Sequence, residues 1–336
     1  MEPKKVLHNS KDDPTIDLAL RPAVWADYVG QEKTKKNLKV ILDASKKRGE
    51  SSDHLLFYGQ AGLGKTTLAY LVAKEMNANL KVTSGPALEK TGDLAAILTN
   101  LEKGDVLFID EAHRLNRMIE EVLYPALESR KLHLIVGKGP GARTLSIDLP
   151  PFTLVAATTR ANLLSGPLRS RFGATFKLDY YDPADIESIV RRSAKLLNLN
   201  VDDQAVSAIA AASRFTPRTA NRLLRRVRDY SQVNNYNVVT EAVAKNTLEM
   251  LEIDNLGLEP TDRQLLSIVI EKFHGGPVGI QTLAAALSDD QGIIEDVYEP
   301  YLMKIGLLNR TPAGRMVTPA AYRHLGIPIP GDGGLV

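Results

Sequence analysis

The sequence predicts an α/β domain with a parallel sheet flanked by helices, then a small helical domain and a C-terminal winged-helix domain. Three observations predict this order. A glycine-rich loop at residues 59–67 separates a strand-like run from a helix-like run. Two other short runs, 105–111 and 152–157, are continuously apolar, as in strands buried on both faces. After residue 182 the apolar spacing becomes helical. We therefore divide the chain at 1–181, 182–254 and 255–336, and expect residues 1–17 to be disordered.

Composition narrows the class of protein. The 336 residues exceed one typical domain, and 44% hydrophobic with 24% charged residues is ordinary for soluble proteins. No apolar run approaches the roughly 20 residues that span a bilayer, so we expect a cytoplasmic protein without a membrane partner. The absence of cysteine excludes disulfides and thiolate metal sites, and the six histidines show no paired ligand spacing. A net charge of +2 does not decide whether nucleic acid binds.

The loop at residues 59–67 has the spacing of a P-loop. Its glycines let backbone N–H groups point at phosphate oxygens, and the next helix adds its positive N-terminal end. We expect Lys65 to reach the β- and γ-phosphates of ATP and the Thr66 hydroxyl to ligate Mg²⁺. The alternative is a glycine-rich turn with a surface lysine, which the flanking strand and helix disfavour. The predicted phosphate-binding residues are Gly62, Leu63, Gly64, Lys65, Thr66 and Thr67.

Two further strands end in polar groups. The run 105–111 ends in Asp110 and Glu111, a Walker B pattern in which the first carboxylate holds Mg²⁺ and the second orients or deprotonates the attacking water. The alternative is that both carboxylates only cap the next helix. The run 152–157 is followed by Thr158 and Thr159 at the sheet edge where ligands bind. Thr159 is a candidate for holding water or the γ-phosphate; a strand-ending threonine chosen for β-propensity remains open.

Four segments together carry a family resemblance: Gly-Leu-Gly-Lys-Thr-Thr, Ile-Asp-Glu-Ala-His-Arg-Leu, Ala-Thr-Thr-Arg, and Pro-Leu-Arg-Ser-Arg-Phe-Gly at 167–173. They resemble the RuvB family of AAA+ ATPases, the motor subunits of bacterial Holliday-junction branch migration, from residue 18 to the C-terminus. One departure is Gln60-Ala61, where the family has Pro-Pro. Those positions supply loop backbone, so we expect nucleotide binding to survive.

The resemblance implies further nucleotide contacts. Leu20, Arg21 and Tyr28 match the segment that wraps the adenine, and Tyr181 matches another contact near the hinge. Arg171 resembles an arginine finger that is supplied to the nucleotide of a neighbouring subunit. The alternative is a local pair with a carboxylate such as Asp179.

The small helical domain resembles the lid of such ATPases. Thr216 and Pro217 open one of its helices, which places Arg218 in the first turn, where a cation opposes the helix dipole. In the family this position senses the γ-phosphate of its own subunit and moves the lid. We expect the remaining arginines of the helix to form a solvated face: Arg222, Arg225, Arg226 and Arg228.

Residues 131–150 predict an inserted β-hairpin, with alternating apolar residues on two arms around a glycine-rich centre. The apolar face either packs on its own domain or docks a partner. In the family this hairpin engages RuvA, which favours docking through Leu145 and Ile147. Residues 84–94 contain no aromatic residue, which disfavours a pore loop that threads polypeptide.

The last 82 residues predict three helices and a strand-turn-strand unit, as in a winged helix. We expect Thr261 and Asp262 to cap the first helix. The segment holds nine acidic and six basic side chains, and the third helix carries Glu295, Asp296 and Glu299. Phosphates would repel that helix from the major groove. Arg310 and Arg315 at the hairpin are therefore the predicted DNA contacts, gripping phosphate without specifying bases. The alternative is a winged helix used only for protein contacts.

These observations and the resemblance lead to one functional hypothesis. The chain is an ATP hydrolase that needs ATP and Mg²⁺, assembles as a homo-oligomeric ring, with a hexamer expected, and drives duplex DNA at four-way junctions. RuvA, and the junction resolvase RuvC, are the partners that the resemblance implies. The alternatives are a clamp-loader subunit, which usually carries Ser-Arg-Cys at the finger, and a nucleotide-gated DNA-binding regulator without turnover.

Overall fold

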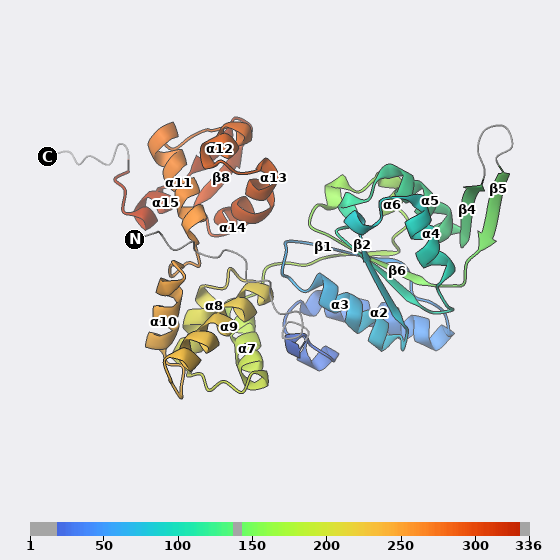
Figure 1. Cartoon of the computed structure of the whole chain (residues 1–336), viewed down its shortest axis with the longest axis horizontal. Coiled ribbons are helices and arrows are strands. Elements are labelled where there is room, and N and C mark those ends of the chain that lie inside the picture. Colours follow the sequence, from blue (N-terminus) through green and yellow to red (C-terminus); the bar gives the residue numbers. More distant parts are fainter. Residues whose placement is uncertain (1–18, 137–142, 330–336) are drawn as a thin grey trace, which may run out of the picture.

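The computed structural model describes residues 19–136 and 143–329, which form three domains in chain order (Figure 1). The expected disorder of residues 1–17 and the centre of the predicted hairpin at 137–142 fall outside the described residues.

The first domain is built on a five-stranded sheet with the order β2-β3-β6-β1-β7. Every neighbouring pair is parallel, as the continuously apolar runs predicted. Because β1 and β3 both pair with β6, the three polar strand ends meet at one edge of the sheet. The strands are β1 (Leu55–Tyr58), β2 (Leu80–Ser84), β3 (Val106–Asp110), β6 (Thr153–Thr158) and β7 (Ala174–Lys177).

Alternating side chains divide this sheet between two apolar cores. On β1, Leu55 and Phe57 enter one core, and Leu56 enters the other. The sheet therefore lies between two layers of helices, visible in Figure 1 as α2 and α3 below the strands and α4 and α5 above them. These helices are α2 (Glu32–Arg48), α3 (Lys65–Glu75), α4 (Thr91–Thr99) and α5 (Arg117–Glu128).

The insertion forms the antiparallel pair β4 (Lys131–Val136) and β5 (Arg143–Asp148). It projects from the end of the sheet domain that faces away from the other two domains (Figure 1). At its base, Leu132 is fully buried in the core shared with α4 and α5. The hairpin is thus anchored at one end and extends from the domain at the other.

The second domain contains α7 (Pro183–Leu196), α8 (Asp203–Ala211), α9 (Pro217–Val233) and α10 (Glu241–Met250). Thr216 caps α9 as predicted: its side chain accepts a hydrogen bond from the Thr219 N–H. The expectation of a solvated arginine face on α9 is wrong for Arg225, whose side chain is buried at 5% exposure. Apolar residues of this domain continue the core that lies under α2 and α3.

The third domain has the winged-helix order. Its helices α11 (Pro260–Phe273) and α12 (Ile280–Leu287) precede a composite third helix, followed by β8 (Leu308–Thr311), β9 (Gly314–Val317) and α15 (Pro319–Leu325). The composite helix is α13 (Gln291–Ile293), a π-helical turn at Ile294–Tyr298, and α14 (Glu299–Lys304). The predicted cap of α11 is corrected: Glu259 is the N-cap, and Asp262 at the third helical position completes a capping box with it.

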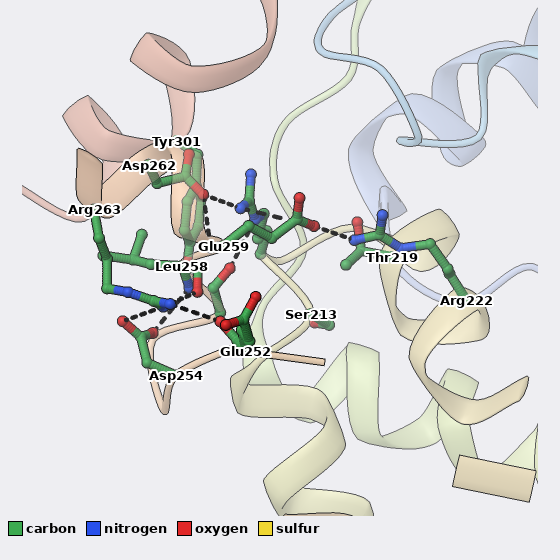
Figure 2. A network of polar contacts seen from close by, with 12 residues as sticks. Ser213, Thr219, Arg222, Glu252, Asp254, Leu258, Glu259, Asp262, Arg263 and Tyr301 are labelled. Atoms are coloured by element: carbon green, nitrogen blue, oxygen red, sulfur yellow. Dashed lines mark hydrogen bonds and ion pairs between the residues drawn. The ribbon is translucent and has the colours of Figure 1, made fainter. Parts of the chain in front are cut away.

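Charged side chains join the second and third domains. In Figure 2, Arg222 on α9 points toward Glu259, and the two groups lie 2.6 Å apart. Arg214 pairs with the fully buried Asp262, and its guanidinium lies 5.2 Å from the centre of the Tyr301 ring. Burial raises the pKa of Asp262, while the Arg214 charge opposes that shift. A buried charge stays in place only with its partner, so this joint fixes the winged helix on the helical domain.

Candidate functional site: a nucleotide pocket between the sheet and the helical domain

A cavity of about 250 Å³ opens where the P-loop, the segment 20–29 and the helical domain meet. Two predicted residues do not line it: Leu63, buried behind the loop, and Arg171, which lies elsewhere. All other residues predicted to bind or hydrolyse the nucleotide do: Leu20, Arg21, Tyr28, Gly62, Gly64, Lys65, Thr66, Thr67, Asp110, Glu111, Thr159, Tyr181 and Arg218. Motifs separated by up to 198 positions in the sequence thus converge on one site.

Lys65 lies inside the loop. Its Nζ donates to the carbonyl oxygens of Gly59, at 2.8 Å, and Gln60, at 2.7 Å. Burial lowers its pKa to about 8, and the nearby Asp110 charge opposes the shift. Gln60 contributes only its backbone oxygen to this contact. The side chain is therefore held ready for phosphate and is desolvated enough to gain from a negative ligand.

Thr66 and Asp110 fit a magnesium ion. The Thr66 hydroxyl donates to an Asp110 carboxylate oxygen at 3.1 Å, which places two oxygen ligands beside the phosphate loop. The described residues contain no cluster of three or more His, Asp or Glu side chains able to hold a metal by themselves. Mg²⁺ suits such a sparse site, since it takes most of its ligands from water and substrate phosphates.

The ends of β3 and β6 are tied together by a residue without a sequence signal. His113, two residues after Glu111, places its Nδ1 at 3.0 Å from the Thr158 hydroxyl. Desolvation lowers the pKa of His113, so its ring is neutral at neutral pH and can accept this proton. Thr158 is 1% exposed, whereas Thr159 lines the cavity. The two threonines therefore differ in position: Thr158 ties the strand end to its neighbours, and Thr159 faces the cavity.

The lid helix α9 approaches the P-loop closely enough to require glycine. A Cβ on Gly62 would lie 2.9 Å from the Arg218 Cβ, and the Gly62 φ of +81° is in the left-handed region. The Arg218 N–H donates to the Gly62 carbonyl at 3.4 Å. Arg218 therefore lines the cavity directly beside the P-loop of its own chain.

Two tyrosines close the opposite wall. The Tyr181 hydroxyl lies 3.2 Å from the Leu63 carbonyl oxygen and 3.2 Å from the Tyr28 hydroxyl. Burial raises the pKa of Tyr181 to about 12, so the hydroxyl stays protonated and can hold the loop. Leu63 thus acts through its backbone, and both tyrosines act on the loop as well as on the cavity.

Among the cavity residues that the sequence did not reveal are two on helices of the lid, Arg192 and Asn221. Arg192 on α7 donates to the carbonyl oxygens of Leu20, at 2.9 Å, and Arg21, at 3.4 Å, which holds the N-terminal segment against the helical domain. Asn221 on α9 accepts from the Ser193 hydroxyl at 2.7 Å. Both lie within regular helices whose periodicity only predicts packing, so no local motif could have revealed them.

Arg171 follows α6 (Gly166–Arg169) and does not line the cavity. Its guanidinium donates to Glu128 at 2.8 Å and lies 4.7 Å from the centre of the Tyr124 ring. A local carboxylate partner was one alternative, but the residue is Glu128, not Asp179. The Tyr124 hydroxyl is itself bonded to Glu120, at 3.0 Å, and to the Ser165 hydroxyl, at 2.9 Å. Glu120, Tyr124 and Glu128 follow one face of α5 at four-residue spacing, so a fixed platform orients Arg171.

The predicted docking residues of the hairpin differ in exposure. Leu145 is 49% exposed, while Ile147 is partly buried and packs against the core of the sheet domain. The base of the hairpin therefore packs on its own domain, and Leu145 further along β5 is exposed.

The two arginines predicted to contact DNA differ strongly in how exposed their side chains are. Arg310 on β8 has a side chain that is 54% exposed. Arg315 on β9 is 7% exposed and pairs with Glu299, itself 2% exposed, and with Glu295 at 3.2 Å. The prediction that Arg315 binds DNA phosphate is therefore wrong. The Arg315 side chain points into the domain from the short strand β9, and Glu299 neutralises its charge there.

The fold and the cavity define a P-loop ATPase of the AAA+ class with a helical lid and a winged helix. Three family models match successive parts of the chain: the Holliday junction DNA helicase RuvB P-loop domain (residues 20–178), the RuvB AAA lid domain (181–254) and the RuvB C-terminal winged helix domain (255–326). The chain belongs to the RuvB family of ATP-dependent Holliday-junction branch-migration motors.

Relatives support this membership over nearly the whole chain. The Holliday junction branch migration complex subunit RuvB of Dehalococcoides mccartyi (strain CBDB1) is 55% identical over 321 residues, 96% of this chain and 92% of the relative. The Thermotoga maritima RuvB Holliday junction branch migration motor superposes with a TM-score of 0.86 at 48% identity, covering 93% of this chain and 100% of that structure. The clamp-loader and regulator alternatives are therefore set aside. None of the described helices has the length and apolarity to cross a membrane.

Proposed function

We propose that this chain is one subunit of a homo-oligomeric ring, expected to be a hexamer, that hydrolyses ATP and moves four-way DNA junctions together with RuvA. The observation that supports this most is the position of Arg171. One chain supplies the P-loop, both Walker B carboxylates, Thr159 and Arg218 to the cavity, but its Arg171 points away from it. A platform that holds an arginine outside its own site suits delivery to the site of a neighbour.

In this arrangement each group has a defined task. Lys65 and Arg218 bind the terminal phosphates, Glu111 orients or deprotonates the attacking water, and Arg171 of the neighbour neutralises charge that develops on the γ-phosphate. Mg²⁺ held by Thr66 and Asp110 would neutralise phosphate charge and orient the leaving group. When the ring assembles, Arg171 would leave Glu128 and pair with the γ-phosphate bound by the neighbouring subunit.

A mixing experiment tests the shared site. Lys65→Ala and Arg171→Ala subunits are each expected to be nearly inactive, because an arginine finger contributes roughly 10³ to 10⁵ in rate. In rings mixed at random in equal amounts, about a quarter of the interfaces pair an intact Lys65 with an intact Arg171. We expect turnover to recover toward that fraction. Arg169→Ala, at an exposed neighbouring position, serves as control. Mixed rings that stay inactive would rule out a finger acting between subunits.

We also propose that Arg310 contacts duplex DNA through phosphate. It is the exposed arginine of the hairpin, and its neighbours Glu295 and Glu299 limit how much phosphate the domain can attract. Arg310→Ala is expected to weaken binding equally for all sequences and reduce its salt dependence by about one counterion. Retained affinity and salt slope would favour a winged helix that contacts protein only.

The hairpin is proposed as the RuvA-binding arm, with Leu145 as its apolar contact. Leu145→Glu is expected to abolish RuvA binding and leave ATP turnover without RuvA intact, whereas Ser146→Glu, on the opposite face of β5, controls for added charge. Unchanged RuvA binding by the Leu145 variant would refute this contact. A cytoplasmic location and contact with RuvC at the junction are further proposals that rest on family membership.

A further inference from the structure

The acidic third helix of the winged helix has partners that explain its charge. Glu299 and Glu295 neutralise Arg315, and Glu295 also lies 3.4 Å from Arg310. Asp296 pairs with a residue of another domain, because the Nε of Arg160 donates to its carboxylate at 2.6 Å. This helix is therefore a docking face within the chain.

The contact at Arg160 is built from several groups. Its guanidinium lies 3.9 Å from Glu295 in addition to the Asp296 bond, and its side chain is 28% exposed. A Cβ on Gly292 would lie 3.7 Å from the guanidinium, so the helix start passes close to it. The Asp296 bond raises the pKa of Arg160, as expected for a cation held among carboxylates.

The backbone of Arg160 belongs to the nucleotide site. Arg160 directly follows Thr159, which lines the cavity, and its N–H donates to the Thr158 hydroxyl at 3.0 Å. That hydroxyl is in turn bonded to His113, two residues after Glu111 in the chain. A change in position of Thr159 would therefore shift Arg160, and with it the carboxylates of the winged helix.

The winged helix has a second attachment that responds to the nucleotide differently. The joint formed by Arg214, Asp262, Arg222 and Glu259 fixes it to the lid (Figure 2). Arg218, one turn before Arg222 on α9, faces the nucleotide cavity. If the lid turns when Arg218 meets phosphate, the winged helix turns with it, and the partly exposed Arg160–Asp296 contact must give way before the buried Arg214–Asp262 pair does.

We propose that Arg160 is a positioning residue that clasps Asp296 and couples the nucleotide at Thr159 to the DNA grip of the β8–β9 hairpin. The link to the hairpin is Glu295, which lies near both Arg160 and Arg310. When the clasp opens, Glu295 loses one cation and binds Arg310 more strongly, in competition with phosphate. This inference rests on the proposed use of Arg310 for DNA.

The coupling between nucleotide and DNA is measured as the ratio of the dissociation constants for DNA in two nucleotide states. If the nucleotide changes DNA affinity, DNA changes nucleotide affinity by the same factor, and such factors are typically about 5- to 150-fold. The clasp predicts that the full-length protein binds a fluorescent duplex with different dissociation constants when it holds ADP and when it holds a slowly hydrolysed ATP analogue. Asp296→Asn should bring the ratio of these constants close to one.

Asp296→Asn is the decisive variant because it keeps the side-chain size, lies outside the nucleotide cavity and is exposed enough to preserve the fold. Its KM for ATP and its turnover without DNA are expected to stay within about twofold of wild type, since the change leaves cavity groups intact. The double variant Arg160→Asp with Asp296→Arg exchanges the two charges. Its ratio of DNA dissociation constants should lie closer to the wild-type ratio than that of the single variant Asp296→Arg. Glu271→Gln, at an exposed position of the same domain, should change nothing.

Three results would overturn the clasp: no nucleotide dependence of DNA affinity in the wild type, an unchanged ratio in Asp296→Asn, or an exchange variant no better than the single variant. Failure of the proposed function is distinguishable from these, since it would appear as full DNA binding by Arg310→Ala or as absence of ATP turnover.

Discussion

Replacing Arg315 with alanine is expected to destabilise the winged helix instead of removing a DNA contact. The guanidinium is 7% exposed and the Glu299 carboxylate 2% exposed. Removing one member of a buried ion pair typically costs about 3–5 kcal/mol, because the other charge stays desolvated. Arg310 lies 4.0 Å from Glu299 and can compensate only in part. We therefore expect a loss near the lower end of this range, about 3 kcal/mol.

Hydrogen exchange followed by mass spectrometry on the full-length protein measures this loss locally. A cost of about 3 kcal/mol raises the opening equilibrium of segment 299–317 by roughly 100-fold. Arg310→Ala is the matched control, because its side chain is exposed and exchange should hardly change. The double variant Arg315→Met with Glu299→Leu should recover most of the protection, since apolar pairs of similar size often replace buried ion pairs without loss.

Wild-type exchange in Arg315→Ala together with weaker DNA binding would refute the reasoning, because that pattern belongs to an exposed phosphate contact. A double variant as unstable as the single one would show that the cost comes from packing of the arginine stem and not from the unpaired carboxylate.

Three other predictions concern the nucleotide site. Tyr124→Leu removes the ring that lies against the Arg171 guanidinium, a contact worth about 0.5–2 kcal/mol. We therefore expect kcat to fall roughly 2- to 30-fold at unchanged KM, and to fall less in Tyr124→Phe. Equal kcat values for the wild type and both variants in steady-state kinetics would contradict the role of α5 in orienting Arg171. The pKa of Lys65 is about 8 without ligand, so nucleotide binding should take up a proton at pH 9 but hardly at pH 7, and the affinity for nucleotide should fall as the pH rises through 8. Calorimetry in two buffers of different ionisation enthalpy measures the proton uptake. A nucleotide affinity that does not depend on pH would exclude the lowered pKa of Lys65. Gly62→Ala, with its positive φ and the 2.9 Å approach to Arg218, should weaken nucleotide binding about 5- to 30-fold, whereas Gly92→Ala, which meets no neighbour, should not.

Local patterns predicted the nucleotide site well. The P-loop and Walker B residues lie next to one another because parallel strands end at one edge, a rule that needs no knowledge of tertiary contacts. The start of α9 was also readable, since Thr216 and Pro217 carry capping information within three residues.

The sequence could not predict which way side chains point or which distant elements contact one another. Arg310 and Arg315 look alike in the sequence, and only the packing of β9 on the domain shows that Arg315 points inward. Arg160 and Asp296 lie 136 positions apart, so no local pattern joins them. The charge count of the winged helix predicts that its third helix avoids DNA, but it could not show which cations neutralise that helix.

The way the cores are divided has a consequence for unfolding. The lid shares a continuous apolar core with one face of the sheet, whereas the winged helix buries a cluster of its own, which Phe215 of the lid contacts beside the charged pairs. Apolar continuity makes neighbouring parts melt together, while a polar joint lets them melt apart. The ATPase domain and its lid therefore form one cooperative unit and the winged helix a second. Heating should unfold the winged helix in a transition of its own, and salt should move the two transitions apart by weakening the joint.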